Sequence, residues 1–185
     1  APTGAGFATV AAGDKYSFAL KSDGSVQCWG AYWLGSCNVP QPNSGFVSID
    51  AVSESAVGLR RDGSIAAWGL ALYGENNVPL PNSGYMAISA SGSHVLGLQI
   101  DGSIRAWGNN ANGVCNVPSP NADCVAVSAR GHCLGLKSDG SIVAWGEAWE
   151  AIIGAELIVN TNGAGAFIGK IYDKGDNTIF AIAIV

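Results

Sequence analysis

Short runs in which apolar and polar residues alternate recur along the chain. They occupy residues 46–51, 85–90 and 124–129, and a second short apolar-rich run follows each of them, for example at residues 94–99. Alternation with a period of two is typical of a β-strand that buries one face. No segment shows the pattern of an amphipathic helix. The sequence therefore predicts an all-β protein built from short strands.

An Asp-Gly dipeptide follows the second strand of each unit, at Asp23, Asp62, Asp101 and Asp139. Asp-Gly favours a tight type I′ hairpin because glycine accepts the positive φ angle that this turn requires. We therefore interpret these acids as turn formers rather than catalytic groups. The third strand then reads Ser-(Ile/Val)-x-x-Trp-Gly.

The Trp-Gly pairs give the period of the repeat. They begin at Trp29, Trp68, Trp107 and Trp145, which are 39, 39 and 38 residues apart. One three-stranded antiparallel sheet cannot bury both of its faces alone, so successive sheets must stack. Radial stacking gives a β-propeller, which we favour over a straight β-solenoid. The four tryptophans are then expected to pack between blades.

We expect one domain over residues 1–185, with four full repeats and a partial fifth. The blades are placed at residues 7–45, 46–84, 85–123 and 124–160, and the partial fifth at residues 161–185. The first three repeats end in linkers with the sequence Asn-Val-Pro-x-Pro-Asn, whose prolines prevent the preceding strand from continuing. In the partial fifth blade, residues 167–170 and 175–182 resemble a first and a second strand, and no third strand follows.

Closure of the array has two alternatives. Residues 155–160 could fold back as the missing third strand and give a compact five-bladed ring, or a second chain could complete the assembly. We slightly favour the second alternative, because the first repeat also presents an uncovered face.

Composition narrows the classes of partner. Hydrophobic residues make up 48% of the 185 residues and charged residues 12%, which is typical of a folded protein. The net charge of −5 is scattered and no basic stripe exists, so nucleic acid is not expected as a partner. No apolar run approaches the ~20 residues of a membrane-spanning helix, so membrane insertion is not expected. Few lysines and many Gly, Ser and Asn favour an extracellular or cell-surface location, with the cytoplasm as the alternative.

The chain has five cysteines, and the odd number leaves at least one unpaired. Cys37 and Cys115 occupy the same repeat position, where the second repeat has Asn76. We interpret this position as a small buried loop residue and expect at least three free thiols. A Cys28–Cys37 or a Cys115–Cys124 disulfide stays open as an alternative.

The run over residues 131–146 and its counterparts in the other repeats resembles the regulator-of-chromosome-condensation repeat family. The short period is most similar to the bacterial branch that includes the type II β-lactamase inhibitor protein. This resemblance covers residues 7–146 well and residues 167–185 weakly. It implies a propeller with three-stranded blades. It does not imply nucleotide exchange on a GTPase, because the wedge-like insertion that this activity needs has no counterpart here.

Candidate chemistry is sparse. His94 and His132 share one repeat position and have no third ligand nearby in the pattern, so we expect structural histidines and no metal. The sequence has no nucleophile elbow, no phosphate-cradling loop and no calcium loop. We therefore expect no enzyme activity and no cofactor.

The loops after the Trp-Gly pairs are the candidate binding site. The loops of the first, second and fourth repeats carry aromatic or aliphatic residues, and the loop of the third repeat is rich in asparagine. Large apolar side chains on loops of a rigid scaffold suit recognition, although they could instead pack on one another or on the C-terminal segment. The candidate residues are Tyr32, Trp33, Leu34, Leu70, Leu72, Tyr73, Asn109, Asn110, Asn112 and Trp149.

Three functions fit these observations. The first is a non-enzymatic module that binds or scaffolds another protein through the rim loops. The second is a lectin, in which Trp33 and Trp149 stack on sugar rings while Asn109, Asn110 and Asn112 supply hydrogen bonds to a glycan. The third is a structural protein that self-associates.

Overall fold

The fold is all-β, as the sequence predicts, and it consists of three-stranded antiparallel sheets. The computed structural model describes residues 2–30, 35–146, 157–161, 167–172 and 179–183. The four blades contain strands β1 (Phe7–Ala12), β2 (Tyr16–Lys21), β3 (Val26–Gly30); β4 (Phe46–Val52), β5 (Ser55–Arg60), β6 (Ile65–Gly69); β7 (Tyr85–Ser91), β8 (His94–Gln99), β9 (Ile104–Gly108); β10 (Cys124–Ala129), β11 (His132–Lys137) and β12 (Ile142–Gly146). A fifth sheet contains β13 (Leu157–Thr161), β14 (Phe167–Tyr172) and β15 (Ile179–Ala183).

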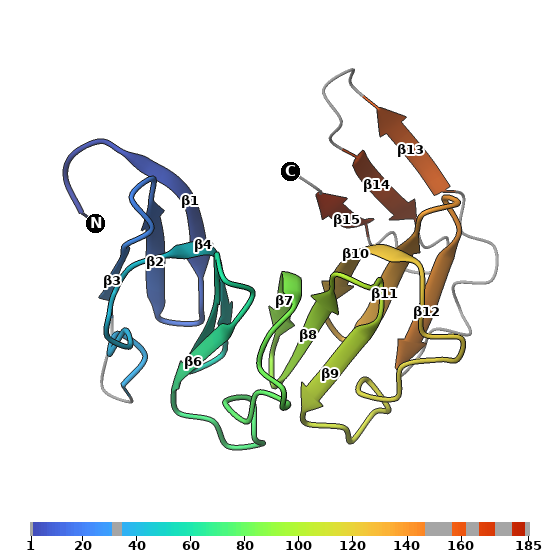
Figure 1. Cartoon of the computed structure of the whole chain (residues 1–185), viewed down its shortest axis with the longest axis horizontal. Coiled ribbons are helices and arrows are strands. Elements are labelled where there is room, and N and C mark those ends of the chain that lie inside the picture. Colours follow the sequence, from blue (N-terminus) through green and yellow to red (C-terminus); the bar gives the residue numbers. More distant parts are fainter. Residues whose placement is uncertain (1, 31–34, 147–156, 162–166, 173–178, 184–185) are drawn as a thin grey trace.

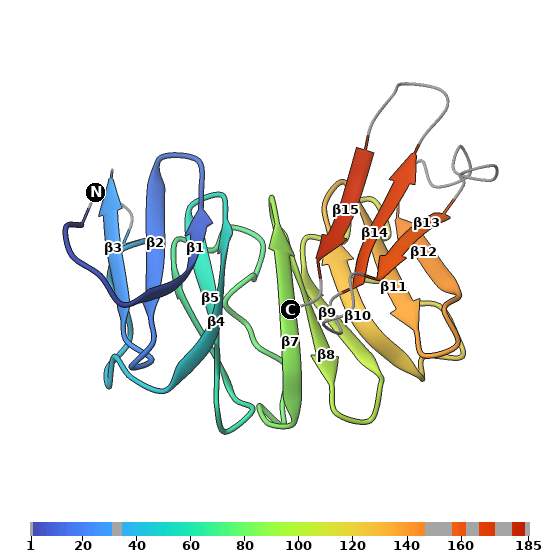
Figure 2. The same cartoon turned by 90° about the horizontal axis from the view of Figure 1, so that it is seen from above.

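The blades follow one another along an arc (Figure 1). Within each blade the middle strand pairs with both neighbours, and the first strands β1, β4, β7 and β10 lie beside one another from blade to blade. Figure 2 shows the first and fifth sheets at opposite ends of the arrangement. Each blade between them has a leading face toward the preceding blade and a trailing face toward the next one.

Apolar side chains fill each interface between blades. In the first interface, Tyr16, Phe18, Leu20 and Val26 from the trailing face of the first blade pack against Phe46, Ile49, Ala56 and Trp68 from the leading face of the second. The positions one repeat further along form the second and third interfaces. Burial of apolar surface between sheets therefore holds the array together.

The repeat tryptophans link adjacent blades. The indole N–H groups of Trp68, Trp107 and Trp145 donate to the carbonyls of Ser36, Glu75 and Val114 in the preceding blade, over 2.8, 2.7 and 2.7 Å. All three indoles are buried. Trp29, in the first of the described blades, is only half-buried, and its indole N–H makes no hydrogen bond in the described part of the chain.

The hairpins after the second strands differ from the predicted type I′ turn. A type I′ turn needs positive φ at both central residues, but Asp123 is the one non-glycine residue with positive φ among those that the structure describes. Instead, Gly24 donates its N–H to the carbonyl of Lys21 over 2.9 Å and has φ +82°. This is a three-residue loop that ends in a left-handed glycine. The Asp23 carboxylate accepts hydrogen bonds from the backbone N–H and the hydroxyl of Ser25, which are 2.9 and 2.6 Å away.

An asparagine in each linker clamps the third strand of the same repeat. Asn82 accepts from the N–H of Ile65 and donates to its carbonyl, both over 2.8 Å. Asn43 and Asn121 make the same pair of bonds to Val26 and Ile104. These residues close the Pro-x-Pro-Asn segments, so the linker is fixed to the blade that it leaves.

The fifth sheet is not completed in the way that the sequence suggested. Residues 157–161 do form a strand, β13, but it pairs with β14 and not with β15. By sequence, β14 corresponds to a first strand and β15 to a second strand. The inserted segment therefore lies on the edge opposite to the one where a third strand would pair, and the compact five-bladed ring is not formed (Figures 1 and 2).

Candidate binding rim

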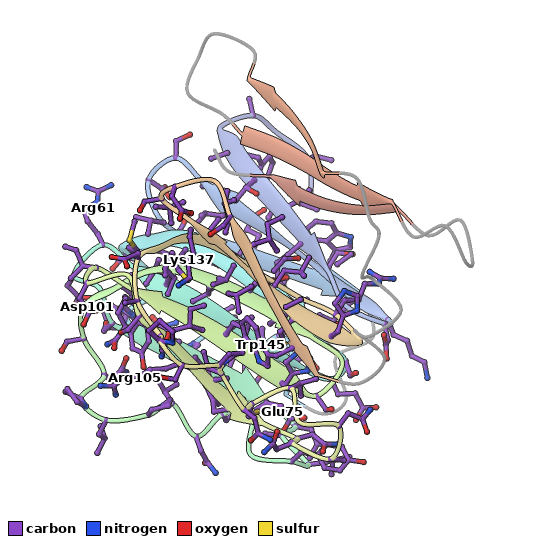
Figure 3. All side chains as sticks on the ribbon, turned by 90° about the vertical axis from the view of Figure 1, so that its right-hand side faces the viewer. Arg61, Glu75, Asp101, Arg105, Lys137 and Trp145 are labelled. Atoms are coloured by element: carbon purple, nitrogen blue, oxygen red, sulfur yellow. A yellow bond between two sulfur atoms is a disulfide. The ribbon has the colours of Figure 1, made fainter. Side chains whose placement is uncertain are left out.

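The predicted loops lie at one end of the blades, which we call the post-Trp rim. The rim consists of the loops after the Trp-Gly pairs and the turns between first and second strands. Leu70 donates its N–H to the carbonyl of Glu54 over 3.1 Å, and Asn109 donates to that of Ser93 over 2.8 Å. The Asp-Gly hairpins and the linkers form the opposite rim. Figure 3 shows this separation: Arg61 and Asp101 lie on one side and Glu75 on the other.

Two predicted residues of the second blade are exposed on this rim. Leu72 is 67% exposed and its neighbour Tyr73 is 56% exposed. Leu70, in the same loop, is only half-buried and sits against the turn of its own blade through Glu54. The loop thus presents one adjacent pair of large side chains to solvent.

The backbone of this loop is held in place by Glu75. Its carboxylate accepts the N–H of Tyr73 over 2.9 Å, and its backbone carbonyl accepts the indole N–H of Trp107 over 2.7 Å. The Glu75 side chain is buried, and Asn77 closes the turn with a bond to the carbonyl of Gly74. Leu72 and Tyr73 therefore stand on a loop that is anchored to the third blade.

The asparagines of the third blade have different environments. Asn110 donates to the side chain of Asn116 and accepts the N–H of Cys115, so its amide is used within the loop. Asn109 accepts the N–H of Ala111 through Oδ1. Asn112 is exposed and makes no hydrogen bond in the described part of the chain.

A cleft of about 230 Å³ lies between the third and fourth blades on the same rim. It is lined by residues that include His94, Asn109, Asn112, Val114 and Arg130. The cleft therefore brings together two of the three predicted asparagines. It also contains Arg130, which the sequence reading did not single out.

His94 forms a buried contact with the fourth blade. Its Nε2 lies 3.3 Å from the Sγ of Cys133. Burial lowers the pKa of His94, so the imidazole is neutral at neutral pH. Burial, with a smaller contribution from Cys115, raises the pKa of the Cys133 thiol to about 12. The two groups therefore lie within hydrogen-bonding distance of each other in the interior, with the thiol in its protonated form.

One disulfide, Cys28–Cys37, is formed, so the interpretation of Cys37 as a small buried loop residue is wrong. The Cα atoms are 5.3 Å apart, within the usual range for a disulfide. The equivalent loop residue in the third blade, Cys115, has Ala106 at the position of Cys28 and therefore no partner. The free thiols are Cys115, Cys124 and Cys133, which agrees with the expectation of at least three.

Four predicted rim residues lie outside the described residues: Tyr32, Trp33, Leu34 and Trp149. Within the described residues, no group of three or more His, Cys, Asp and Glu side chains could hold a metal ion. The same part of the chain contains no helix that is long and apolar enough to cross a membrane.

Sequence reasoning missed two acidic residues, Glu75 on this rim and Asp50 in β4. Glu75 replaces Ser36 and Val114 of the neighbouring repeats, and this departure from the repeat is the signal that could have drawn attention to it. Asp50 is half-buried and accepts the N–H groups of Ala51 and, in the next blade, of Ala90. Burial raises the pKa of Asp50. Both acids serve contacts between blades.

Comparison with known proteins agrees with this architecture. The family model of the regulator of chromosome condensation (RCC1) repeat matches residues 7–31. No curated protein shows significant similarity to the chain.

Several solved structures share the fold. Prp20p from Saccharomyces cerevisiae is 16% identical with a TM-score of 0.67, and the match covers 90% of this chain and 55% of that one. Human WBSCR16 is 14% identical with a TM-score of 0.69, and the match covers 97% and 67%. The ectodomain of the receptor kinase ACR4 from Arabidopsis thaliana is 24% identical with a TM-score of 0.60, and the match covers 76% and 50%.

The chain spans little more than half the length of Prp20p. These identities show a common fold and carry no activity over to this chain. With an RCC1 repeat matched at its first blade and four blades arranged as in these structures, the chain has the β-propeller fold of the RCC1-repeat proteins.

Proposed function

We propose that the chain is a non-enzymatic module that binds another protein through the post-Trp rim, with Leu72 and Tyr73 as the centre of the contact. The observation that carries this proposal is the exposure of two adjacent large side chains on a loop whose backbone is anchored by Glu75 and Trp107. Two large side chains that stay exposed, and do not pack against their own blade, are available to contact a partner.

The size of the pair is sufficient for a binding hot spot. Full burial of one large apolar side chain contributes about 1.5–3 kcal/mol. Tyrosine is enriched among the residues that dominate protein interfaces, because it buries a large ring at a small cost in side-chain entropy. The polar cleft with Arg130 and Asn112 lies one blade further along the rim and offers hydrogen bonds at the edge of such a contact.

Proteins of this fold supply further support. A yeast RCC1 protein, Prp20, has been crystallised bound to Kap60, and it is 17% identical with a TM-score of 0.68. This supports protein partners in general. We further assign the chain to the bacterial branch with short repeats that includes the type II β-lactamase inhibitor protein. The support is the 39-residue period together with the three-stranded blades.

The proposal of a non-catalytic role is supported by the use of the polar side chains. The four Asp-Gly carboxylates accept bonds within their own turns, and His94 contacts Cys133 in the interior. An extracellular or cell-surface location is supported by the Cys28–Cys37 disulfide, since disulfides persist in oxidising compartments.

Affinity capture tests the proposal. The wild-type chain, the double variant Leu72→Ser/Tyr73→Ala and the control Leu80→Ser are immobilised and exposed to secreted and surface proteins of the source cells. Leu80 is also exposed, but it lies in a linker of the opposite rim. We expect wild type and control to capture the same partner, and the double variant to bind it at least ~30-fold more weakly, which corresponds to the loss of a hot spot of about 2 kcal/mol. Equal binding by all three proteins would refute the rim as the site.

A glycan array distinguishes the lectin alternative, two of whose predicted residues, Asn109 and Asn112, line the cleft. Specific glycan binding that is lost in Asn112→Ala and retained in Leu72→Ser/Tyr73→Ala would replace protein binding as the function. A silent array together with a captured protein supports the proposal.

A further inference from the structure

The cleft between the third and fourth blades lies where the fourth blade departs from the repeat. The turn between the first and second strands of this blade is one residue shorter than in the other three blades: His132 follows Cys124 by eight residues, whereas His94 follows Tyr85 by nine. Arg130 lies in the shortened turn and lines the cleft. The one-residue difference that makes the last Trp-Gly interval 38 residues long is therefore located at the cleft.

The guanidinium group of Arg130 is not used to hold the blades together. The side chain is exposed, and it makes no hydrogen bond or ion pair in the described part of the chain. Only the backbone N–H of Arg130 is bonded, to the carbonyl of His132 over 2.9 Å. Arg105 on the opposite rim differs, because it donates to the side chain of Gln99 and to the carbonyl of Leu80. The charge of Arg130 therefore stays available to a ligand.

Neutral hydrogen-bond donors lie around this charge. Asn109, Asn112 and Ser93 also line the cleft. The side chains of Asn112 and Ser93 make no hydrogen bond to any residue that the structure describes. The Asn109 side chain uses only its oxygen, which accepts the N–H of Ala111 over 2.9 Å. The two amide NH₂ groups and the hydroxyl can therefore donate to an acceptor that enters the cleft.

The charge of the cleft selects the class of ligand. None of the described residues that line it is acidic. Burial lowers the pKa of His94, so this imidazole is neutral at neutral pH and Arg130 supplies the one positive charge of the lining. A carboxylate carries one negative charge, and its two oxygens match the planar fork of a guanidinium. A phosphate monoester, with a charge of about −1.5 to −2, would bring more negative charge than one arginine neutralises.

The size of the cleft limits the ligand further. Its volume is about 230 Å³. Pockets that enclose whole drug-sized ligands have volumes of roughly 300–1,000 Å³. The cleft is therefore suited to a carboxylate on a short side chain or at a chain end, and it is too small to enclose a nucleotide.

We propose that this cleft binds a carboxylate of the protein partner, with Arg130 forming a bidentate ion pair and the amides of Asn109 and Asn112 donating hydrogen bonds. This inference rests on the proposed function, because it places the partner over the post-Trp rim. There Leu72 and Tyr73 contact apolar side chains of the partner, one blade away from the ion pair. The apolar contact supplies most of the affinity, and the charged contact fixes the orientation of the partner.

NMR titration of the ¹⁵N-labelled chain tests the cleft without a partner. The probe is glutamate with both backbone ends blocked, as N-acetylglutamate amide, and the matched control probe is the corresponding blocked glutamine. We expect the glutamate probe to shift the side-chain signals of Asn109, Asn112 and Arg130 with a Kd on the order of 10 mM, as one charge-assisted pair without an apolar anchor allows. The glutamine probe should leave these signals unchanged.

Two arginine variants make the titration specific. Arg130→Gln should bind the glutamate probe at least ~10-fold more weakly than wild type. The matched control is Arg61→Gln, which removes the same charge from an exposed arginine on the opposite rim (Figure 3) and should bind like wild type. Arg130→Lys keeps the charge but not the planar fork, so it should bind with intermediate affinity. Far-UV circular dichroism verifies that each variant keeps the fold.

Further probes identify the source of the carboxylate. Tighter binding of the blocked glutamate assigns an acidic side chain, and tighter binding of N-acetylalanine assigns a chain terminus. Inorganic phosphate or glucuronic acid binding more tightly than both would overturn the proposal. So would equal binding of the glutamate probe by Arg130→Gln and Arg61→Gln, and so would unshifted cleft signals in wild type at about 100 mM probe, roughly ten times the expected Kd.

These results separate the carboxylate site from the proposed function. A failed titration overturns the carboxylate site and leaves capture through Leu72 and Tyr73 as it stands, because the probes carry no large apolar side chain. Capture that is unaffected by Leu72→Ser/Tyr73→Ala refutes the rim contact whatever the titration shows. With a captured partner in hand, Arg130→Gln should weaken its binding at least ~10-fold and reduce the salt dependence of that binding. Unchanged binding of the partner by Arg130→Gln would overturn the inference.

Discussion

Replacement of Asn82 by alanine should strongly destabilise the second blade, although this asparagine lies in a linker and was not among the candidate functional residues. Its side chain both accepts from the N–H and donates to the carbonyl of Ile65, each over 2.8 Å. Ile65 is buried at the start of β6, so these two backbone groups have little access to replacement water. The variant thus leaves a donor and an acceptor unsatisfied.

The magnitude follows from these two bonds. An intramolecular hydrogen bond contributes about 1 kcal/mol net, and a buried group left without a partner costs about 1–3 kcal/mol. For the two groups we expect a loss of about 2–6 kcal/mol in the free energy of unfolding. In a protein of this size each kcal/mol lowers the melting temperature by about 2–4 °C, so Tm should fall by roughly 4–24 °C.

Urea unfolding followed by tryptophan fluorescence measures the loss. The matched control is Asn77→Ala, because Asn77 is an exposed loop asparagine whose side chain makes no hydrogen bond in the described part of the chain. The control should stay within about 0.5 kcal/mol of wild type. The variant Asn82→Asp keeps the acceptor and loses the donor, so it should also be destabilised at neutral pH. If Asn82→Ala unfolds at the same urea concentration as Asn77→Ala, the clamp does not stabilise the blade.

Three further predictions concern the interfaces, the turns and the thiols. Trp107→Phe should lose about 1–3 kcal/mol in the free energy of unfolding, because it leaves the buried carbonyl of Glu75 without its donor. Trp29→Phe removes no hydrogen bond of the described part of the chain and should be nearly neutral. Equal losses of the two variants in urea unfolding would contradict this prediction. Hydrogen bonds from the hydroxyl and the backbone N–H of Ser103 lower the pKa of the Asp101 carboxyl. Its contribution to stability is therefore complete above the unfolded-state pKa, near 3.8, and is lost as the pH falls through the lower folded-state value. Because Ser103→Ala removes only the hydroxyl, an NMR titration of this variant should show that pKa moving up, and an unchanged value would rule out the hydroxyl hydrogen bond as its cause. Thiol titration should find three groups in the denatured, unreduced chain and five after reduction, and a count of five before reduction would exclude the Cys28–Cys37 disulfide.

Features that repeat in the sequence could be predicted from it. The alternating runs and the Trp-Gly spacing specify three strands per repeat, because each strand carries its own period-two pattern. The confirmed all-β fold depends only on such local patterns. The turn type could not be predicted in the same way: Asp-Gly suits several hairpins, and the serine that follows, such as Ser25, binds the aspartate and favours the longer loop.

Features that depend on contacts across the chain could not be predicted. The Asn82 clamp joins residues 17 positions apart, and no local pattern relates them. The disulfide of Cys37 depends on its distance from Cys28 and not on the repeat, since Cys115 stands at the same position without a partner. On the rim, the loop sequence identified Leu72 and Tyr73, but it could not separate them from Leu70, because exposure depends on how the loop folds over its own blade.

The bonds between blades have a consequence for how such a gene can change. Ser53 donates to Gly92, 39 residues away, and the N–H of Ala90 bonds to Asp50, 40 residues away. Unequal crossing-over between equivalent codons removes or adds one whole period. A chain in which residue 45 is followed by residue 85 would place Trp107 against Phe18, where Trp68 now lies. Each recombinant of this kind inherits complete interfaces, so the number of blades can vary in evolution without the invention of a new contact.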